Sequence, residues 1–319
     1  MHNIGGYFEL EQPKAPIWQQ PELHRLASGR ACLTAILQHL KPKQAYVPHY
    51  CCDSVLAPFR ELAIELHFYS IDQQFNPRSL PQLEPQAVLL WINYFGICSD
   101  FKTQLTASYH PEQLIIDDTH NLFGFEPSPY YSFSSLRKYF GIPDGALLCA
   151  PSASVAATPA PARQTQHLEL RAAGQVQQGY SFYQAHEQRF DCAIAEMHPL
   201  SQQLMRQVDM LAVYQSRLRN FHLLHQRLGK YNQLDIPSHP VSPFCYPLLT
   251  EDAIDRTALS QQGLFIPSLW ADVETRRPET PATERHLAQH LLALPIDHRY
   301  SIVQMTVLAD AVEQLLQTE

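Results

Sequence analysis

The sequence has no excess of positive charge. Its 319 residues carry 23 lysines and arginines against 31 aspartates and glutamates, which gives a net charge of −8. Proteins that bind nucleic acid or anionic membranes through charge carry the opposite balance. We therefore expect neither nucleic acid nor membrane as a partner. The hydrophobic content of 45% is enough for a large core, which a chain of this length often divides between domains.

The sequence also lacks cysteines at the spacing of metal sites and lacks long apolar runs. The seven cysteines are scattered through apolar segments without a Cys-x-x-Cys spacing, so neither a zinc site nor a disulfide framework is predicted. His49 stands near Cys51 and Cys52, but adjacent cysteines do not readily bind one ion, and we expect no metal. No run is long enough to span a membrane, and residues 1–12 lack the basic and then apolar order of a secretory signal. These absences favour a reduced, cytoplasmic protein.

Lysine is scarce, which narrows the search for a reactive amine. It occurs at Lys14, Lys41, Lys43, Lys102, Lys138 and Lys230. Of these, only Lys138 directly follows a strand-like run, 130–134, and precedes a turn rich in glycine and proline, 141–145.

Carboxylates stand shortly before this lysine. Residues 114–116 are typical of a buried parallel strand, and the run ends in Asp117 and Asp118, with His120 close behind. Ligands of open α/β sheets lie at the carboxyl ends of strands. Pyridoxal phosphate (PLP) chemistry requires a lysine that forms a Schiff base and a carboxylate that keeps the pyridinium nitrogen protonated. The alternative is that these are ordinary loop carboxylates and that Lys138 is a solvated lysine.

A third feature suits an anion. Ser28 is a good helix N-cap, Gly29 lets a ligand approach the backbone, and Arg30 adds a charge. The residues that follow, as far as Leu40, keep helical periodicity. The N–H groups at such a helix start can bind a phosphate. An ordinary capped helix has the same pattern, so the sequence leaves both interpretations open.

The order of elements predicts an α/β protein with a mostly parallel sheet. We expect a large domain over 1–160, which ends near the Ala/Pro/Ser-rich segment 150–162, connecting helices over 161–230, and a small C-terminal α+β domain over 231–319. The predicted strands are 44–48, 64–69, 87–92, 114–116, 130–134, 245–249, 263–267 and 294–296. Further helices are predicted over 54–62, 164–174, 180–195, 201–228, 252–262, 285–293 and 301–317.

These segments, in this order, resemble the DegT/DnrJ/EryC1/StrS family of PLP-dependent aminotransferases, which have the fold-type-I architecture of aspartate aminotransferase. The likeness covers almost the whole chain. The matching motifs are Gly5-Gly6-Tyr7-Phe8, Ser28-Gly29-Arg30-Ala31, Asn93-Tyr94-Phe95-Gly96, Asp117-Asp118-Thr119-His120, Ser135-Leu136-Arg137-Lys138, 263–270 and 291–301. A short variant with the Ser-Leu-Arg-Lys motif is the closer likeness, because members that aminate nucleotide sugars are usually longer and have Gly-Thr in place of Gly29-Arg30.

The resemblance implies a role for each matched residue. Lys138 would form the Schiff base and then move a proton between substrate and cofactor. Asp117 would pair with the pyridinium nitrogen, because the family has His or Gln three residues after that aspartate, and His120 would lie near the ring hydroxyl. The residues implied in cofactor binding are Ser28, Gly29, Arg30, Tyr50, Asn93, Ser132 and Ser135. Tyr50 would stack on the ring, although the family's stacking position aligns nearer Cys52.

The implied activity moves an amino group from an amino-acid donor to a keto compound, such as a keto sugar or sugar nucleotide. Lys138 favours this over the family's dehydratases, which have histidine there. Two alternatives stay open: a PLP-fold protein that binds or regulates without turnover, and a PLP enzyme of another reaction type. Family members are homodimers, so segments 5–11 and 180–195 are the expected contacts between subunits.

Overall fold

The computed structural model describes residues 4–7, 10, 23–276 and 280–317. Its centre is a seven-stranded sheet in the order β2-β8-β7-β6-β5-β3-β4. The strands are β2 (His24–Leu26), β3 (Gln44–Pro48), β4 (Glu65–Tyr69), β5 (Ala87–Ile92), β6 (Leu114–Asp117), β7 (Tyr131–Ser135) and β8 (Ala146–Cys149). Strand β8 is antiparallel to both neighbours, and the remaining pairs are parallel. The prediction of an α/β fold with a mostly parallel sheet is confirmed.

The central strands owe their composition to burial on both faces. Every residue of β5 and of β6 is buried, as expected for a parallel sheet that other elements cover on both sides. The elements that connect these strands are α1 (Gly29–Leu40), α2 (Asp53–Glu61), η1 (Tyr94–Gly96), α3 (Phe101–Ser108), η2 (Pro111–Gln113), η3 (Leu122–Gly124) and η4 (Leu136–Lys138). Because η1, η3 and η4 follow three parallel strands, they lie at one edge of the sheet.

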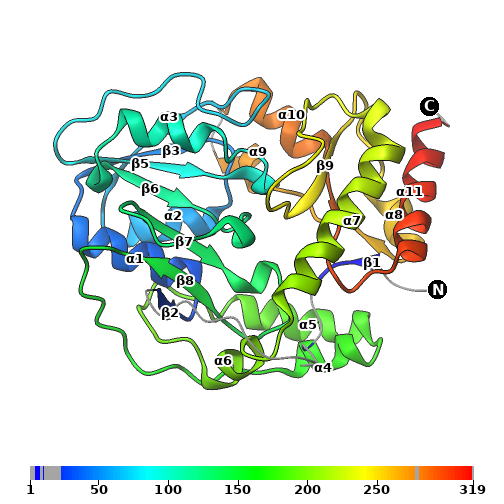
Figure 1. Ribbon diagram of the computed structural model, residues 1–319, viewed down its shortest axis with the longest axis horizontal. Helices are drawn as coiled ribbons and strands as arrows, with labels where there is room; N and C mark the ends of the chain where they lie inside the picture. The colour runs from blue at the N-terminus through cyan, green and yellow to red at the C-terminus, as the bar shows by residue number, and fades with distance from the viewer. Residues whose placement is uncertain (1–3, 8–9, 11–22, 277–279, 318–319) are drawn as a thin grey trace.

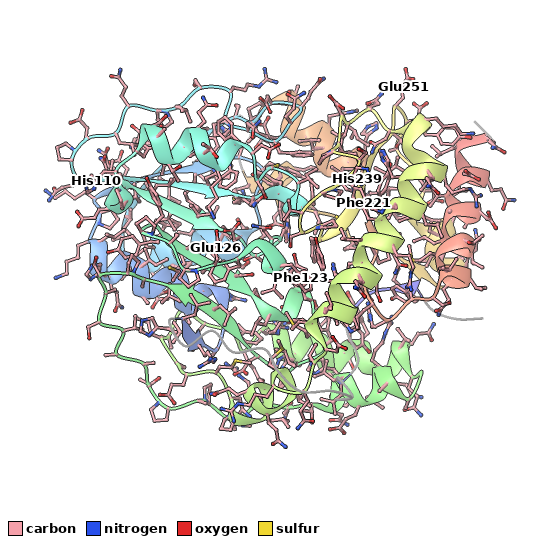
Figure 2. The ribbon with its side chains drawn as sticks, in the orientation of Figure 1. His110, Phe123, Glu126, Phe221, His239 and Glu251 are labelled. Carbon is pink, nitrogen blue, oxygen red and sulfur yellow. The ribbon has the colours of Figure 1, made fainter. Side chains whose placement is uncertain are left out.

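The rest of the chain lies beside and below the sheet in Figure 1. Its elements are β1 (Ile4–Gly5), α4 (Gln166–Ala172), α5 (Val176–Glu187), α6 (Pro199–Met205), α7 (Met210–Leu228), η5 (Gly229–Tyr231), β9 (Cys245–Leu249), α8 (Arg256–Gln261), β10 (Leu264–Phe265), α9 (Asp272–Arg276), α10 (Ala282–His290), β11 (Leu291–Pro295) and α11 (Ile302–Gln317). Strands β9 and β11 form an antiparallel pair, and β1 pairs with β10 in parallel. In Figure 2, Phe221 of α7 faces β9, where its ring centroid lies 5.2 Å from that of Tyr246.

The connecting helices differ from the prediction in their boundaries. The predicted helix over 201–228 is two helices, because the Asp209 carboxylate caps α7 by accepting a hydrogen bond from the Ala212 N–H at 3.0 Å. The predicted helix over 180–195 begins and ends earlier, as α5. Strands β2 and β8 were not predicted, since neither is long enough to show a period. The domain limits near 160 and 230 stay a prediction.

None of the helices within the described ranges is long and apolar enough to cross a membrane. The cysteines Cys32, Cys51, Cys52, Cys98, Cys149, Cys192 and Cys245 are all free thiols, and most are buried.

Candidate active site

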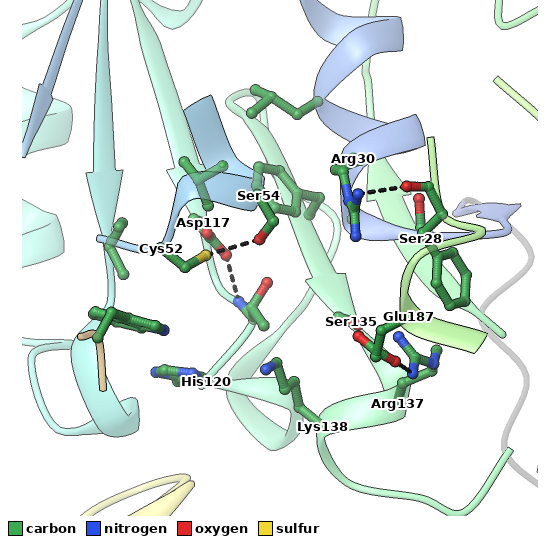
Figure 3. A pocket seen from close by; sticks show the side chains of 18 residues that line it. Ser28, Arg30, Cys52, Ser54, Asp117, His120, Ser135, Arg137, Lys138 and Glu187 are labelled. Atoms are coloured by element: carbon green, nitrogen blue, oxygen red, sulfur yellow. Dashed lines mark hydrogen bonds and ion pairs between the residues drawn. The ribbon is translucent and has the colours of Figure 1, made fainter. Parts of the chain in front are cut away.

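A cavity lies at the carboxyl ends of β5, β6 and β7 (Figure 3). Its lining comes from the start of α1, the start of α2, the ends of these strands, the end of α5 and Trp270. The predicted site residues that line it are Ser28, Gly29, Arg30, Asp117, His120, Ser135 and Lys138. Segments more than a hundred residues apart therefore meet where ligands of open α/β sheets bind.

Asp117 is the last residue of β6 and directs its carboxylate into this cavity. The side chain is only 4% exposed, and its Oδ1 accepts a hydrogen bond from the Thr119 N–H at 2.9 Å. Burial raises the pKa of Asp117 to about 6, although the hydrogen bonds from Thr119 and the charge of Lys138 oppose this shift. A cation bound beside this carboxylate would favour its ionised form.

Asp118, the neighbouring carboxylate, is held away from the cavity. Its Oδ1 accepts hydrogen bonds from the side-chain amides of Asn93 and Asn121 at 2.9 and 3.0 Å. Its Oδ2 lies 3.4 Å from the ammonium of Lys102. Of these two neighbouring carboxylates, Asp117 is therefore the one that can meet a ligand in the cavity.

Lys138 ends η4, the turn that follows β7, and its ammonium is exposed within the cavity. The turn is held by a hydrogen bond of 3.1 Å from the Leu136 N–H to the Gly145 carbonyl. Gly145 has a φ of +137°, and a Cβ there would press on the Met197 side chain, so glycine suits this position. Within the part of the chain that the structure describes, the Lys138 ammonium has no ion-pair or hydrogen-bond partner. It is therefore available to a ligand.

His120 faces the cavity as a neutral ring. Its Nδ1 accepts a hydrogen bond from the Phe95 N–H at 3.3 Å, so the proton of the neutral ring is on Nε2. Phe244 stacks on it with ring centroids 4.2 Å apart and planes 2° from parallel. Burial, helped by the charges of Lys138 and Arg217, holds the pKa of His120 well below its usual value. His120 therefore offers an N–H donor rather than a positive charge.

The start of α1 supplies the anion-binding end. Ser28 caps the helix, and its Oγ accepts a hydrogen bond from the Ala31 N–H at 3.1 Å. Gly29 and Arg30 follow at the first helical positions, and Ser135 lines the same cavity from the end of β7. Backbone N–H groups at a helix start carry partial positive charge, which Arg30 strengthens.

The structure does not bring Tyr50 to the cavity. Its ring is fully buried against Tyr94 and Trp270, and its hydroxyl donates to the Leu269 carbonyl. The residue that lines the cavity from this turn is Cys52. The stacking role predicted for Tyr50 is therefore not supported, because the turn after β3 directs this ring into the core.

Asn93 and Ser132 also lie outside the cavity lining. Asn93 is fully buried, where it donates to Asp118 and accepts from the Cys98 N–H at 3.2 Å. Ser132 is buried within β7. Asn93 thus positions the loop of Asp118 instead of facing a ligand.

Other lining residues were missed because they come from distant or unremarkable segments. Thr119 stands beside Asp117, and Glu187, Phe190 and Trp270 reach the cavity from later parts of the chain. Arg137 belongs to the predicted motif, but the sequence assigned it no role. Of these residues, only Thr119 and Arg137 could have been predicted from the sequence, because each lies within a motif that contains a predicted site residue.

No family model matches this sequence, and no curated protein matches it. Solved structures do match its fold. A DegT DnrJ EryC1 StrS aminotransferase from Brucella abortus matches with a TM-score of 0.64 and 14% identity over 92% of this chain and 85% of that chain. The sugar aminotransferase CalS13 from Micromonospora echinospora matches with a TM-score of 0.61 and 12% identity over 92% and 87%.

Spr1654 from Streptococcus pneumoniae, in its PLP form, matches with a TM-score of 0.63 and 11% identity over 99% of both chains. At such low identities these likenesses establish the fold. The chain has the fold-type-I architecture of the DegT/DnrJ/EryC1/StrS aminotransferases, as the sequence predicts. Its activity has to be argued from the cavity.

Proposed function

We propose that this protein is a PLP-dependent aminotransferase, which moves an amino group from an amino-acid donor to a keto compound. The observation that carries the proposal is that Asp117 and Lys138 line one cavity together with the start of α1 (Figure 3). When bound there, PLP would supply an electron sink for negative charge on the substrate carbon next to the nitrogen.

The chain's own groups fit this cofactor at three points. Asp117, whose buried carboxylate forms no ion pair with any described residue, would hold a protonated pyridine nitrogen. His120 would donate its Nε2–H to the ring oxygen, since its Nδ1 already accepts from Phe95. The start of α1, with Ser28 and Arg30, would bind the phosphate.

Lys138 would be the proton carrier. Its ammonium is exposed and forms no ion pair or hydrogen bond with the described residues, so the flexible side chain can move within the cavity. With a substrate amine bound in the cavity, the Lys138 side-chain amine would take a proton from the substrate carbon next to the nitrogen and return one to the adjoining position.

We extend the proposal to the acceptor, which we take to be a keto sugar or sugar nucleotide. Its support is the shared fold with CalS13, which is named a sugar aminotransferase. Purified holoprotein incubated with an amino donor and candidate keto sugars should give an amino sugar by mass spectrometry. Conversion of keto acids alone would contradict this choice of acceptor.

Substitution of Lys138 tests the core of the proposal. The wild-type protein with PLP should show a visible absorbance band that bleaches with an amine donor. Lys138→Ala should lose this band, and its turnover rate should fall at least a thousandfold. Lys230→Ala, which changes an exposed lysine outside the cavity lining, is the matched control. A band unchanged in Lys138→Ala would rule out this lysine. Cofactor binding without bleaching by any donor would instead favour a non-catalytic binding or regulatory protein, and bleaching without transfer would favour another PLP reaction.

We also propose that two copies form a homodimer. On α5, Tyr180 and Phe182 are 52% and 39% exposed, and a subunit contact would cover them. The other predicted contact, 5–11, falls largely outside the residues whose side chains the structure describes. Light scattering should give twice the chain mass, and Tyr180→Glu should lower it. A cytoplasmic location stays a prediction from the sequence.

A further inference from the structure

An ion pair that the proposed chemistry does not use lines the same cavity. Arg137, directly before Lys138, forms an ion pair and hydrogen bond with Glu187 at the end of α5 (Figure 3). Both side chains are lining residues. The Arg137 side chain is 18% exposed and that of Glu187 is 34% exposed, so the carboxylate lies on the more open side of the pair.

Glu187 occupies a position that does not suit a carboxylate on local grounds. It is the last residue of α5, and the negative end of a helix disfavours negative charge. Burial would raise its pKa, but the charge and hydrogen bond of Arg137 outweigh burial and lower the pKa of Glu187 overall. Arg137 is therefore what makes a carboxylate favourable here.

The guanidinium of Arg137 has a support that does not depend on Glu187. It lies 4.3 Å from the centroid of the Phe190 ring, which is itself 5% exposed. Arg163 packs against the same ring at 4.5 Å, but its charge is taken up by the buried Asp144 at 3.2 Å. Arg137 can thus keep its place on Phe190 when its carboxylate partner changes.

We propose that Arg137 binds the α-carboxylate of the amino donor, and that Glu187 is a substitute counterion which this carboxylate displaces. The inference rests on the proposed function. Glu187 already presents a carboxylate to Arg137 next to Lys138, so the cavity accommodates that group there. Exchange of one carboxylate for another keeps Arg137 paired, and the displaced Glu187, whose side chain is 34% exposed, can turn its charge toward solvent.

The phosphate of the cofactor is the other anion that would enter this cavity. It has its own binding groups in the start of α1, with Ser28 and Arg30, and in Ser135. The inference therefore assigns Arg137 as the residue that selects the proposed amino-acid donor over amines without a carboxylate.

Donor selectivity tests this assignment in the holoprotein. The half-saturating concentration for bleaching the cofactor band is compared between L-alanine and isopropylamine, which lacks the carboxylate. Arg137→Gln should lower the preference for L-alanine at least tenfold, whereas Glu187→Gln should raise it several-fold because the competing carboxylate is gone. Arg189→Gln and Glu169→Gln, which change exposed residues outside the cavity, should leave the preference unchanged. An unchanged preference in Arg137→Gln would overturn the proposal.

A binding measurement on the cofactor-free protein gives a readout that does not need catalysis. By calorimetry, succinate should bind Glu187→Gln more tightly than wild type and should bind Arg137→Gln at least tenfold more weakly. The affinity for inorganic phosphate should fall in Arg30→Gln and stay unchanged in Arg137→Gln. If Arg137→Gln loses phosphate and keeps succinate, Arg137 serves the cofactor and the proposal is wrong. Absence of the visible band in the wild type would instead refute the proposed function. The succinate affinities would still show whether Arg137 binds a carboxylate.

Discussion

At the scale of single residues, the buried carboxylate of Asp117 serves the proposed function at a cost in folding stability. Its pKa of about 6 lies above the usual value of 3.8. A carboxylate with a raised folded-state pKa favours folding below its usual pKa, and this contribution is lost as the pH rises through the folded-state value. The difference between these two pKa values corresponds to about 3 kcal/mol. The ionised carboxylate therefore destabilises the folded protein at neutral pH, and a cation bound beside it would oppose this effect.

The first prediction follows for Asp117→Asn in the cofactor-free protein. Its free energy of unfolding in urea should exceed that of wild type by up to about 3 kcal/mol at pH 8, and the gain should vanish near pH 4. The same variant should bind PLP at least a hundredfold more weakly, because the amide cannot hold a pyridinium charge. Asp118→Asn is the contrast, and should lose stability because Asp118 is held by Asn93, Asn121 and Lys102. A gain of equal size at both pH values would contradict the role of ionisation.

At the scale of elements, η1 is packed tightly against the backbone that presents His120. Gly96 has a φ of +69°, and a Cβ there would collide with the carbonyl oxygens of Ser242 and His120. The Phe244 N–H donates to the Phe95 carbonyl at 2.8 Å, which ties the segment before β9 to η1. The close approach of these backbones seats Phe244 on the His120 ring.

We predict that Gly96→Ala will lower the free energy of unfolding by at least about 3 kcal/mol, since it adds both a steric clash and an unfavourable φ. Gly174→Ala is the matched control, because Gly174 has a similar φ of +76° with nothing within 4 Å of the added Cβ. It should cost about 1 kcal/mol. Denaturant unfolding of both variants measures the difference. Equal losses in the free energy of unfolding would show that the close contact at Gly96 adds no destabilisation.

Most elements of the sheet follow from local patterns, and the errors have identifiable causes. Apolar runs such as 87–92 and 114–116 predict buried strands because their burial on both faces requires apolar residues throughout. The turn after β3 could not be predicted in the same way. Arg276 of α9 donates to the His49 carbonyl at 3.2 Å and to the Asp53 carboxylate at 2.7 Å. This long-range clamp orients the turn so that Cys52, and not Tyr50, reaches the cavity.

At the scale of the whole molecule, the cavity joins segments that are remote in sequence. Trp270 reaches it from the C-terminal part of the chain, while Lys138 and Asp117 belong to the sheet. A ligand that contacts all of these residues should stabilise both parts of the molecule together, because it binds only when both are folded. At a hundredfold excess over Kd, such binding adds about 2.7 kcal/mol to the free energy of unfolding.

Hydrogen exchange can measure this coupling. With saturating PLP, amides near the start of α1, around Lys138 and around Trp270 should all exchange at least tenfold more slowly. Inorganic phosphate should protect the start of α1 alone. Unchanged exchange around Trp270 in the presence of PLP would show that the C-terminal part does not close on the ligand.

The sequence alone determined the parallel strands of the sheet and placed Asp117 and Lys138 at the carboxyl ends of two of them. Local apolar runs define buried strands, and the carboxyl ends of parallel strands meet at one edge, so residues just after two such strands are brought together by topology alone. The tertiary structure decided what surrounds that pair. The choice of Cys52 over Tyr50, the withdrawal of Asn93 into the core and the arrival of Glu187 all depend on contacts between segments that no local pattern connects.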